Sequence, residues 1–103
     1  MEAIKEQPVD SIEVLASSVR IPDHVVYRTF VYETVVLNLK TGKYHGLNRI
    51  GGRMLEVVER EASVRDAADK LAVEYGRPVA EIEADLCEFC SDLAERGLVV
   101  LEQ

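Results

Sequence analysis

The chain has 103 residues, of which 48% are hydrophobic and 30% charged, and its formal net charge is -7. This length allows one domain with one core, and the composition is that of a globular chain. No apolar run approaches the roughly 20 residues that cross a bilayer, and the N-terminus lacks the features of a signal peptide. We therefore expect a cytoplasmic protein. Its acidity disfavours nucleic acid and anionic lipid as partners, because both bind through Lys and Arg.

The charge is unevenly distributed along the chain. Residues 34–55 contain four bases and no acid, whereas residues 56–103 contain thirteen acids and five bases. A basic segment on an acidic protein favours an acidic ligand that approaches that face. An alternative, at least as compatible with the composition, is that these bases balance carboxylates across the fold. The four bases are Lys40, Lys43, Arg49 and Arg53.

The first half of the chain predicts a short β-meander. Residues 1–22 show no clear period and contain Pro8 and Pro22, so we expect a tail or lead-in segment there. The stretches VVYRTF and TVVLNL are rich in β-branched and aromatic residues and predict two strands. Residues 40–42 then supply a turn, with Gly42 able to take the left-handed conformation, and KYHGL predicts a third strand. We expect this last strand to lie at a sheet edge.

The second half predicts three helices. Asn48 is a good N-cap, and apolar residues recur at helical spacing through NRIGGRMLEVVERE. Gly51 and Gly52 in its first turn disfavour a helix, which indicates close approach of another backbone, unless they are glycines tolerated near a frayed end.

The next two helices have their own boundary signals. Ser63 resembles the start of a capping box, and its apolar stripe ends at Gly76. Pro78 opens a third helix that ends before Gly97, and GLVVL follows as a short extended segment. Strands followed by helices predict an α+β domain with segregated layers.

The sequence offers little for catalysis or metal binding. Cys87 and Cys90 lie mid-helix in acidic surroundings, which does not suit a redox pair, and a zinc site would need distant ligands such as His24 and His45. We expect both cysteines to be small, reduced, buried hydrophobic residues. His45 has no partner in a recognisable catalytic arrangement, and no phosphate-binding loop is present. We therefore predict no enzyme activity, no metal and no cofactor.

Three segments in order resemble one family. Residues 37–51, LNLKTGKYHGLNRIG, are similar to the hairpin and "LN, xx, G" signature of PqqD-like proteins, and residues 64–75 resemble that family's next helix. The resemblance covers residues 23–101, so it implies that residues 23–103 form a PqqD-like leader-peptide-binding domain. The family's closing helix pattern is matched by Ile82, Asp85, Leu86, Phe89, Leu93, Gly97 and Leu98.

The resemblance implies a winged-helix-like fold of three strands and three helices and a non-catalytic function. PqqD-like domains, also called RiPP recognition elements, bind the leader of a ribosomally made precursor peptide and present it to a modifying enzyme. The hairpin looks more like relatives from lasso-peptide and radical-SAM peptide pathways than PqqD of pyrroloquinoline quinone biosynthesis. The implied partners are the precursor peptide and a radical SAM maturase or a lasso-peptide leader protease and cyclase.

The resemblance also implies a site, because the leader of such proteins lies along the third strand and against the third helix. An exposed edge strand offers unpaired backbone groups to such a ligand. On the third helix we choose the flank that carries an aromatic residue beside a carboxylate, rather than the flank of Cys87 and Cys90. The predicted peptide-binding residues are Lys43, Tyr44, His45, Gly46, Leu47, Ile82, Asp85 and Phe89.

Two other functions compete with peptide binding. A winged-helix nucleic-acid-binding regulator would use the basic segment, but the third helix is acidic where a DNA-reading helix should be basic. A thiol or zinc protein would use Cys87 and Cys90. Residues 1–22 have no counterpart in the family motif and would be a tail, or a segment swapped in a homodimer.

Overall fold

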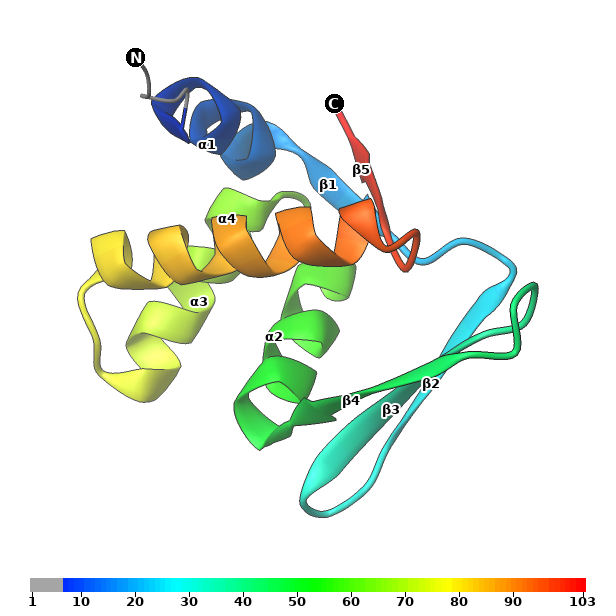
Figure 1. Ribbon diagram of the computed structural model, residues 1–103. Helices are drawn as coiled ribbons and strands as arrows, with labels where there is room; N and C mark the ends of the chain where they lie inside the picture. The colour runs from blue at the N-terminus through cyan, green and yellow to red at the C-terminus, as the bar shows by residue number, and fades with distance from the viewer. Residues whose placement is uncertain (1–6) are drawn as a thin grey trace.

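The computed structural model describes the chain from Gln7 to Gln103 (Figure 1). It is an α+β fold in which a three-stranded antiparallel sheet precedes three helices, as predicted. Within residues 7–103, no helix has the length and apolar character needed to span a membrane. In chain order the elements are α1 (Gln7–Ala16), β1 (Ser18–Arg20), β2 (Val25–Thr29), β3 (Glu33–Asn38), β4 (Tyr44–Asn48), α2 (Arg49–Arg60), α3 (Val64–Tyr75), α4 (Val79–Glu95) and β5 (Val100–Glu102).

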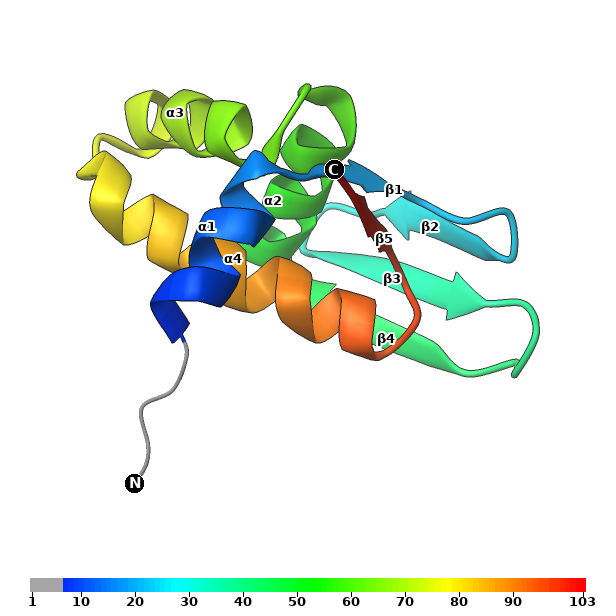
Figure 2. The ribbon, with the colours of Figure 1, turned by 90° about the horizontal axis from the view of Figure 1, so that it is seen from above.

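The main sheet has the strand order β2-β3-β4, so β4 is an edge strand, as the sequence predicted. Gly42 closes the β3–β4 hairpin with a φ of 76°, which is the left-handed region that favours glycine. The amide oxygen of Asn38 accepts the N–H of Lys40 at 2.9 Å and further orders this turn. Figure 2 shows that β4 lies on the side of the sheet nearer α4.

The predicted helix boundaries are confirmed by their caps. The side chain of Asn48 accepts the N–H of Gly51 at 2.8 Å, and the side chain of Ser63 accepts the N–H of Asp66 at 3.1 Å. Gly76 ends α3 in the left-handed conformation with a φ of 63°. Helix α4 begins directly after Pro78.

The N-terminal segment corrects the prediction of a tail or lead-in over residues 1–22. Residues 7–16 form α1, and β1 pairs antiparallel with β5 of the same chain. The buried Val14 and Leu15 attach α1 to the core, and the carbonyl of Ser17 accepts the N–H of Val64 at 2.8 Å. A proline in the first turn of a helix removes no intrahelical hydrogen bond, so Pro8 did not rule the helix out. Residues 1–6 lie outside the described part of the chain.

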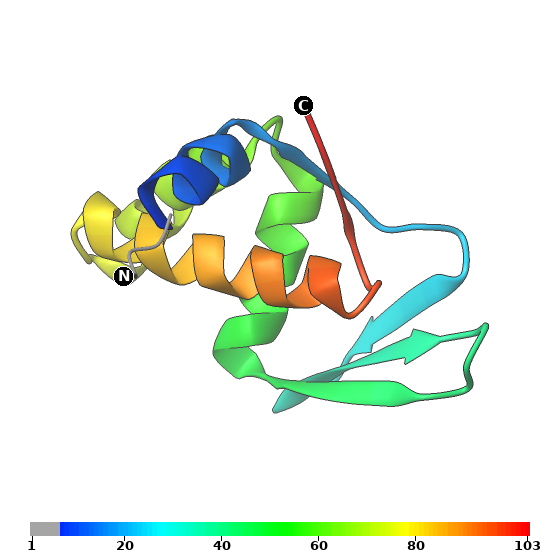
Figure 3. The same ribbon diagram turned by 45° about the horizontal axis from the view of Figure 1, so that its top comes forward.

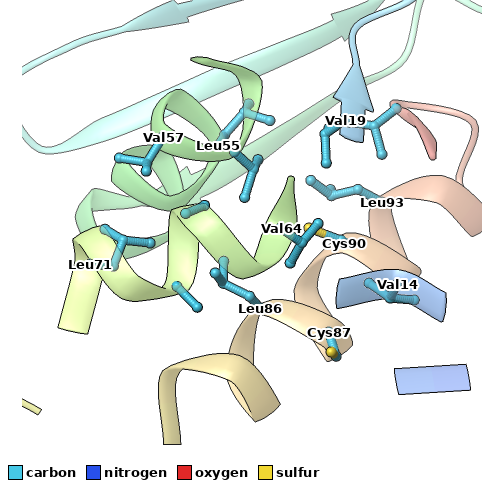
Figure 4. Close-up of a cluster of buried hydrophobic side chains, with 14 of the residues drawn as sticks. Val14, Val19, Leu55, Val57, Val64, Leu71, Leu86, Cys87, Cys90 and Leu93 are labelled. Carbon is cyan, nitrogen blue, oxygen red and sulfur yellow. The ribbon is translucent and has the colours of Figure 1, made fainter. Parts of the chain in front are cut away.

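The hydrophobic core lies among the helices, and α1 covers α4 (Figure 3). Apolar side chains from α1, β1, α2, α3 and α4 meet there, including both cysteines (Figure 4). The sheet adds Val25 and Val36 to this core. The labelled members of the cluster are Val14, Val19, Leu55, Val57, Val64, Leu71, Leu86, Cys87, Cys90 and Leu93.

Helix α2 lies close against the sheet at Gly52. A Cβ atom added to Gly52 would lie 2.2 Å from Oγ1 of Thr34, which is itself 1% exposed. The Thr34 hydroxyl donates to Oγ1 of Thr29 at 3.2 Å, so it is held in place. The prediction of close approach at this glycine pair therefore holds for Gly52, but the neighbour is a side chain of β3 rather than another backbone. Any larger residue at position 52 would push α2 away from the sheet.

We predict that Gly52→Ala destabilises the protein by about 1–3 kcal/mol, because the added methyl group overpacks the contact with Thr34. Gly51→Ala is the matched control in the same turn. A Cβ at Gly51 meets its nearest neighbour, Cβ of Leu47, at 3.4 Å. Urea unfolding followed by circular dichroism measures both variants. Equal losses of unfolding free energy in the two variants would contradict the importance of the Gly52 contact.

Candidate peptide-binding groove

The backbone of β4 leaves one row of hydrogen-bonding groups unpaired by the sheet. The N–H of Asn38 donates to the carbonyl of Lys43 at 2.9 Å, which identifies these two residues as a hydrogen-bonded pair. Pairs alternate along an antiparallel ladder, so His45 and Leu47 also turn their backbone groups toward β3. The residues that alternate with these, Tyr44 and Gly46, turn their N–H and C=O groups outward, toward the open edge of the sheet.

The same alternation determines where the side chains of β4 point. His45 and Leu47 lie opposite the buried Val36 and Thr34, on the helix-facing side of the sheet, and both are half-buried. Tyr44 belongs to the other face and is 72% exposed. Lys43 is exposed and precedes the strand, although the sequence analysis placed it within the strand.

A groove of about 660 Å³ runs beside this edge, between β4, the start of α2 and one side of α4. The ring of Phe89 approaches the backbone of α2, since a Cβ added to Gly51 would lie 3.6 Å from its Cε1 atom. Glycine at this position therefore keeps the groove open where the two helices meet. The groove is lined by Gly46, Leu47, Asn48, Ile50, Gly51, Met54, Asp85, Glu88, Phe89 and Asp92.

The structure brings together half of the residues that the sequence assigned to the site. Gly46, Leu47, Asp85 and Phe89 line the same groove. Ile82 lines a smaller recess that shares Ile50, Met54 and Asp85 with the groove. Lys43, Tyr44 and His45 are not among the lining residues of either hollow.

Helix α2 contributes to this groove, which was not predicted from the sequence. Ile50 and Met54 were assigned only to the apolar face of a helix, but Ile50 is 57% exposed and lines the groove with Met54. Their i, i+4 spacing places them on one side of the helix, yet a sequence does not show whether that side meets the core or a ligand. The carboxylates Glu88 and Asp92 also line the groove but were not among the predicted peptide-binding residues.

The basic segment of the sequence does not form one basic surface at the groove. Arg53 pairs with Glu74 at 2.7 Å and with Glu56 at 3.3 Å, and the hydrogen bond from Arg53 holds the pKa of Glu74 below its usual value. The guanidinium of Arg49 lies 5.7 Å from the ring centre of Tyr32. The groove lining contains three carboxylates from α4 and none of the four bases. The alternative that the bases balance carboxylates therefore holds for Arg53.

The opposite flank of α4, which carries Cys87 and Cys90, faces α1 and the core. Cys87 is 7% exposed, and its Sγ atom lies 3.7 Å from the carbonyl oxygen of Ser11. Burial raises the pKa of Cys87, and it raises the pKa of Cys90 to about 12. Among the side chains that the structure describes, residues 11–103, no three of His, Cys, Asp or Glu are arranged to hold a metal ion.

Comparison with known proteins identifies relatives of this fold. The family model described as coenzyme PQQ synthesis protein D (PqqD) matches residues 33–99. The structure "TbiB1 in Complex with the TbiA(beta) Leader Peptide" is similar, with a TM-score of 0.71 and 32% identity over 78% of this chain and 93% of that chain. "Lasso peptide synthetase B1 complexed with the leader peptide" has a TM-score of 0.73 and 23% identity over 81% of this chain and 98% of that chain. The search of curated proteins found no match.

We predict that both thiols of the folded protein react slowly with a maleimide at pH 8, because only a thiolate is nucleophilic. A pKa of about 12 in place of 9.0 leaves Cys90 with about a thousandfold less thiolate than an ordinary cysteine. Mass spectrometry after labelling measures the rates, and Cys90→Ala isolates Cys87. Unfolding in guanidinium should expose both thiols and make them react at the rate of an ordinary cysteine. Rapid labelling of either thiol in the folded protein would contradict the packing role.

Proposed function

This chain belongs to the PqqD family, and we propose that it is a non-catalytic protein that binds the leader of a ribosomally synthesised precursor peptide. The observation that carries the proposal is the open edge of β4 beside a groove that α2 and α4 line. The similarity to TbiB1, which was solved with a leader peptide, supports it. We further propose that the chain acts in the cytoplasm, where it presents the precursor to a radical SAM maturase or a lasso-peptide leader protease and cyclase.

Strand addition fits the backbone geometry of β4. Tyr44 and Gly46 together offer two N–H donors and two C=O acceptors at the spacing of an antiparallel ladder. An extended peptide that pairs with them becomes a fourth strand of the sheet. Each such hydrogen bond contributes about 0.5–1.5 kcal/mol net, so the backbone alone supports modest, sequence-tolerant affinity. Specificity must come from side chains in the groove.

Side chains of the groove suit one face of such a strand. Residues of a strand alternate between the two sheet faces, so every second ligand residue would point toward Phe89, Met54 and Ile50. Those three side chains offer apolar contact area. In this arrangement the side chains of His45 and Leu47 lie on the helix-facing side of β4, while Tyr44 flanks the ligand on the opposite face of the sheet.

Nucleic-acid binding has no support at α4. A helix that enters a DNA groove needs basic residues to meet phosphates. The exposed residues of α4 include Glu81, Asp85, Glu88, Asp92 and Glu95. Duplex DNA would therefore be repelled by the surface that a winged helix would present to it.

The direct test is titration calorimetry with the leader of a precursor peptide encoded beside this chain's gene. We expect binding at or below tens of micromolar and no chemical change in the peptide by mass spectrometry. A failure of every such leader to bind, or tight binding of duplex DNA at physiological salt, would overturn the proposal.

We predict that Gly46→Pro weakens leader binding about tenfold or more, because proline removes an outward N–H and its ring blocks the docking edge. Gly46→Ala is the matched control. Its Cβ would meet Oε1 of Glu33 at an ordinary 3.5 Å, and it keeps the N–H. Fluorescence anisotropy with a labelled leader measures both, after circular dichroism has shown that both fold. Equal affinities of the two variants would exclude pairing at this residue.

A further inference from the structure

The groove has an acidic wall that the proposed function does not by itself require. Asp85, Glu88 and Asp92 project from α4 at i, i+3 and i+7, and all three line the groove beside the β4 edge. Asp92 pairs with Arg96 at 3.1 Å on the exposed surface of the helix. Among residues 11–103, whose side chains the structure describes, Asp85 and Glu88 have no ion-pair or side-chain hydrogen-bond partner. Within that part of the chain, at least two carboxylates of the wall therefore face the groove without a compensating charge.

A peptide bound in this groove would change the surroundings of these carboxylates. It would displace water from the space between β4 and α4, where Phe89 and Met54 already exclude solvent on one side. A carboxylate that loses water without gaining a partner destabilises the complex, and an acidic ligand residue nearby adds repulsion. A Lys or Arg of the ligand would offset that cost with a charge-assisted hydrogen bond.

The wall is long enough to face two same-side residues of an extended strand. Asp92 follows Asp85 by seven positions, which is about 10 Å of helix at 1.5 Å per residue. Alternate residues of a strand lie about 6.7 Å apart on the same face. Two ligand side chains at positions i and i+2, on the face turned toward α4, would therefore both reach the wall.

We propose that this groove selects leader segments with Lys or Arg at alternate, inward-facing positions, among apolar residues that contact Phe89 and Met54. The inference rests on the proposed function and names the chemistry of its ligand. It reverses the prediction from the sequence, in which the four bases of residues 34–55 would attract an acidic ligand. Selectivity arises as much from rejection of acidic segments as from attraction of basic ones.

The test begins with selection of random 12-residue peptides displayed on phage against the whole protein. Clones that lose binding to Gly46→Pro but not to Gly46→Ala are taken as occupants of the β4 edge. We expect these clones to be enriched in Lys and Arg at positions two apart. Edge-dependent clones with no such enrichment would overturn the inference and leave the proposed function intact. A complete lack of edge-dependent clones would overturn the proposed function itself.

The double variant Asp85→Asn, Glu88→Gln then tests the wall with one selected peptide. We expect binding about 2- to 10-fold weaker at 50 mM NaCl and a shallower loss of affinity toward 300 mM NaCl. The control is Asp23→Asn, Asp69→Asn, which changes the net charge equally through two exposed residues that do not line the groove. We expect the control to bind within twofold of the parent. Equal losses in both variants would assign the effect to overall charge and overturn the role of the wall.

Discussion

The contact between Gly52 and Thr34 determines how the helices meet the sheet. With no side chain at position 52, α2 lies directly on β3, and the N-cap at Asn48 joins α2 to the end of β4 without a linker. Helix α4 packs on the rest of the helical layer, so its Phe89 side reaches the start of α2. The groove exists because these three elements converge. A bulkier residue at 52 would separate them.

The edge of β4 and the wall of α4 divide the work of recognition. In our proposal, backbone groups of Tyr44 and Gly46 supply pairing that any extended peptide can use, whereas the side chains of the groove discriminate among peptides. Apolar contact comes from Phe89 and the exposed part of α2, and charge comes from α4. This division would let one fold serve different precursor peptides by changing a few groove residues while the edge stays the same.

The main sheet and the helices after it could be predicted from the sequence because their signals are local. Gly42, Asn48, Ser63 and Gly76 each terminate or start an element by a conformation or a cap that neighbouring residues determine. The pairing of β1 with β5 could not be predicted, since it joins residues 80 to 84 positions apart and each strand has three residues. Helix α1 was missed because its stability depends on burial of Val14 and Leu15 against elements far along the chain.

The convergence of residues at the candidate groove could be predicted in part. An edge strand follows from strand order, and the flank of α4 with Asp85 and Phe89 does face β4. The sequence could not show that Arg53 is paired with Glu74 while Asp85 and Glu88 line an open groove. Charge counts along a chain do not give charge positions in space, which is why the expected acidic ligand gives way to a basic one in our proposal.

The most direct measurement is amide hydrogen exchange by NMR on the protein with and without a saturating leader peptide. In the free protein, the amides of His45 and Leu47 donate to β3 and should be protected, while those of Tyr44 and Gly46 should exchange rapidly. With leader bound, strand addition predicts that Tyr44 and Gly46 become protected as well. A saturated complex in which these two amides still exchange at their free rates would contradict binding at the β4 edge.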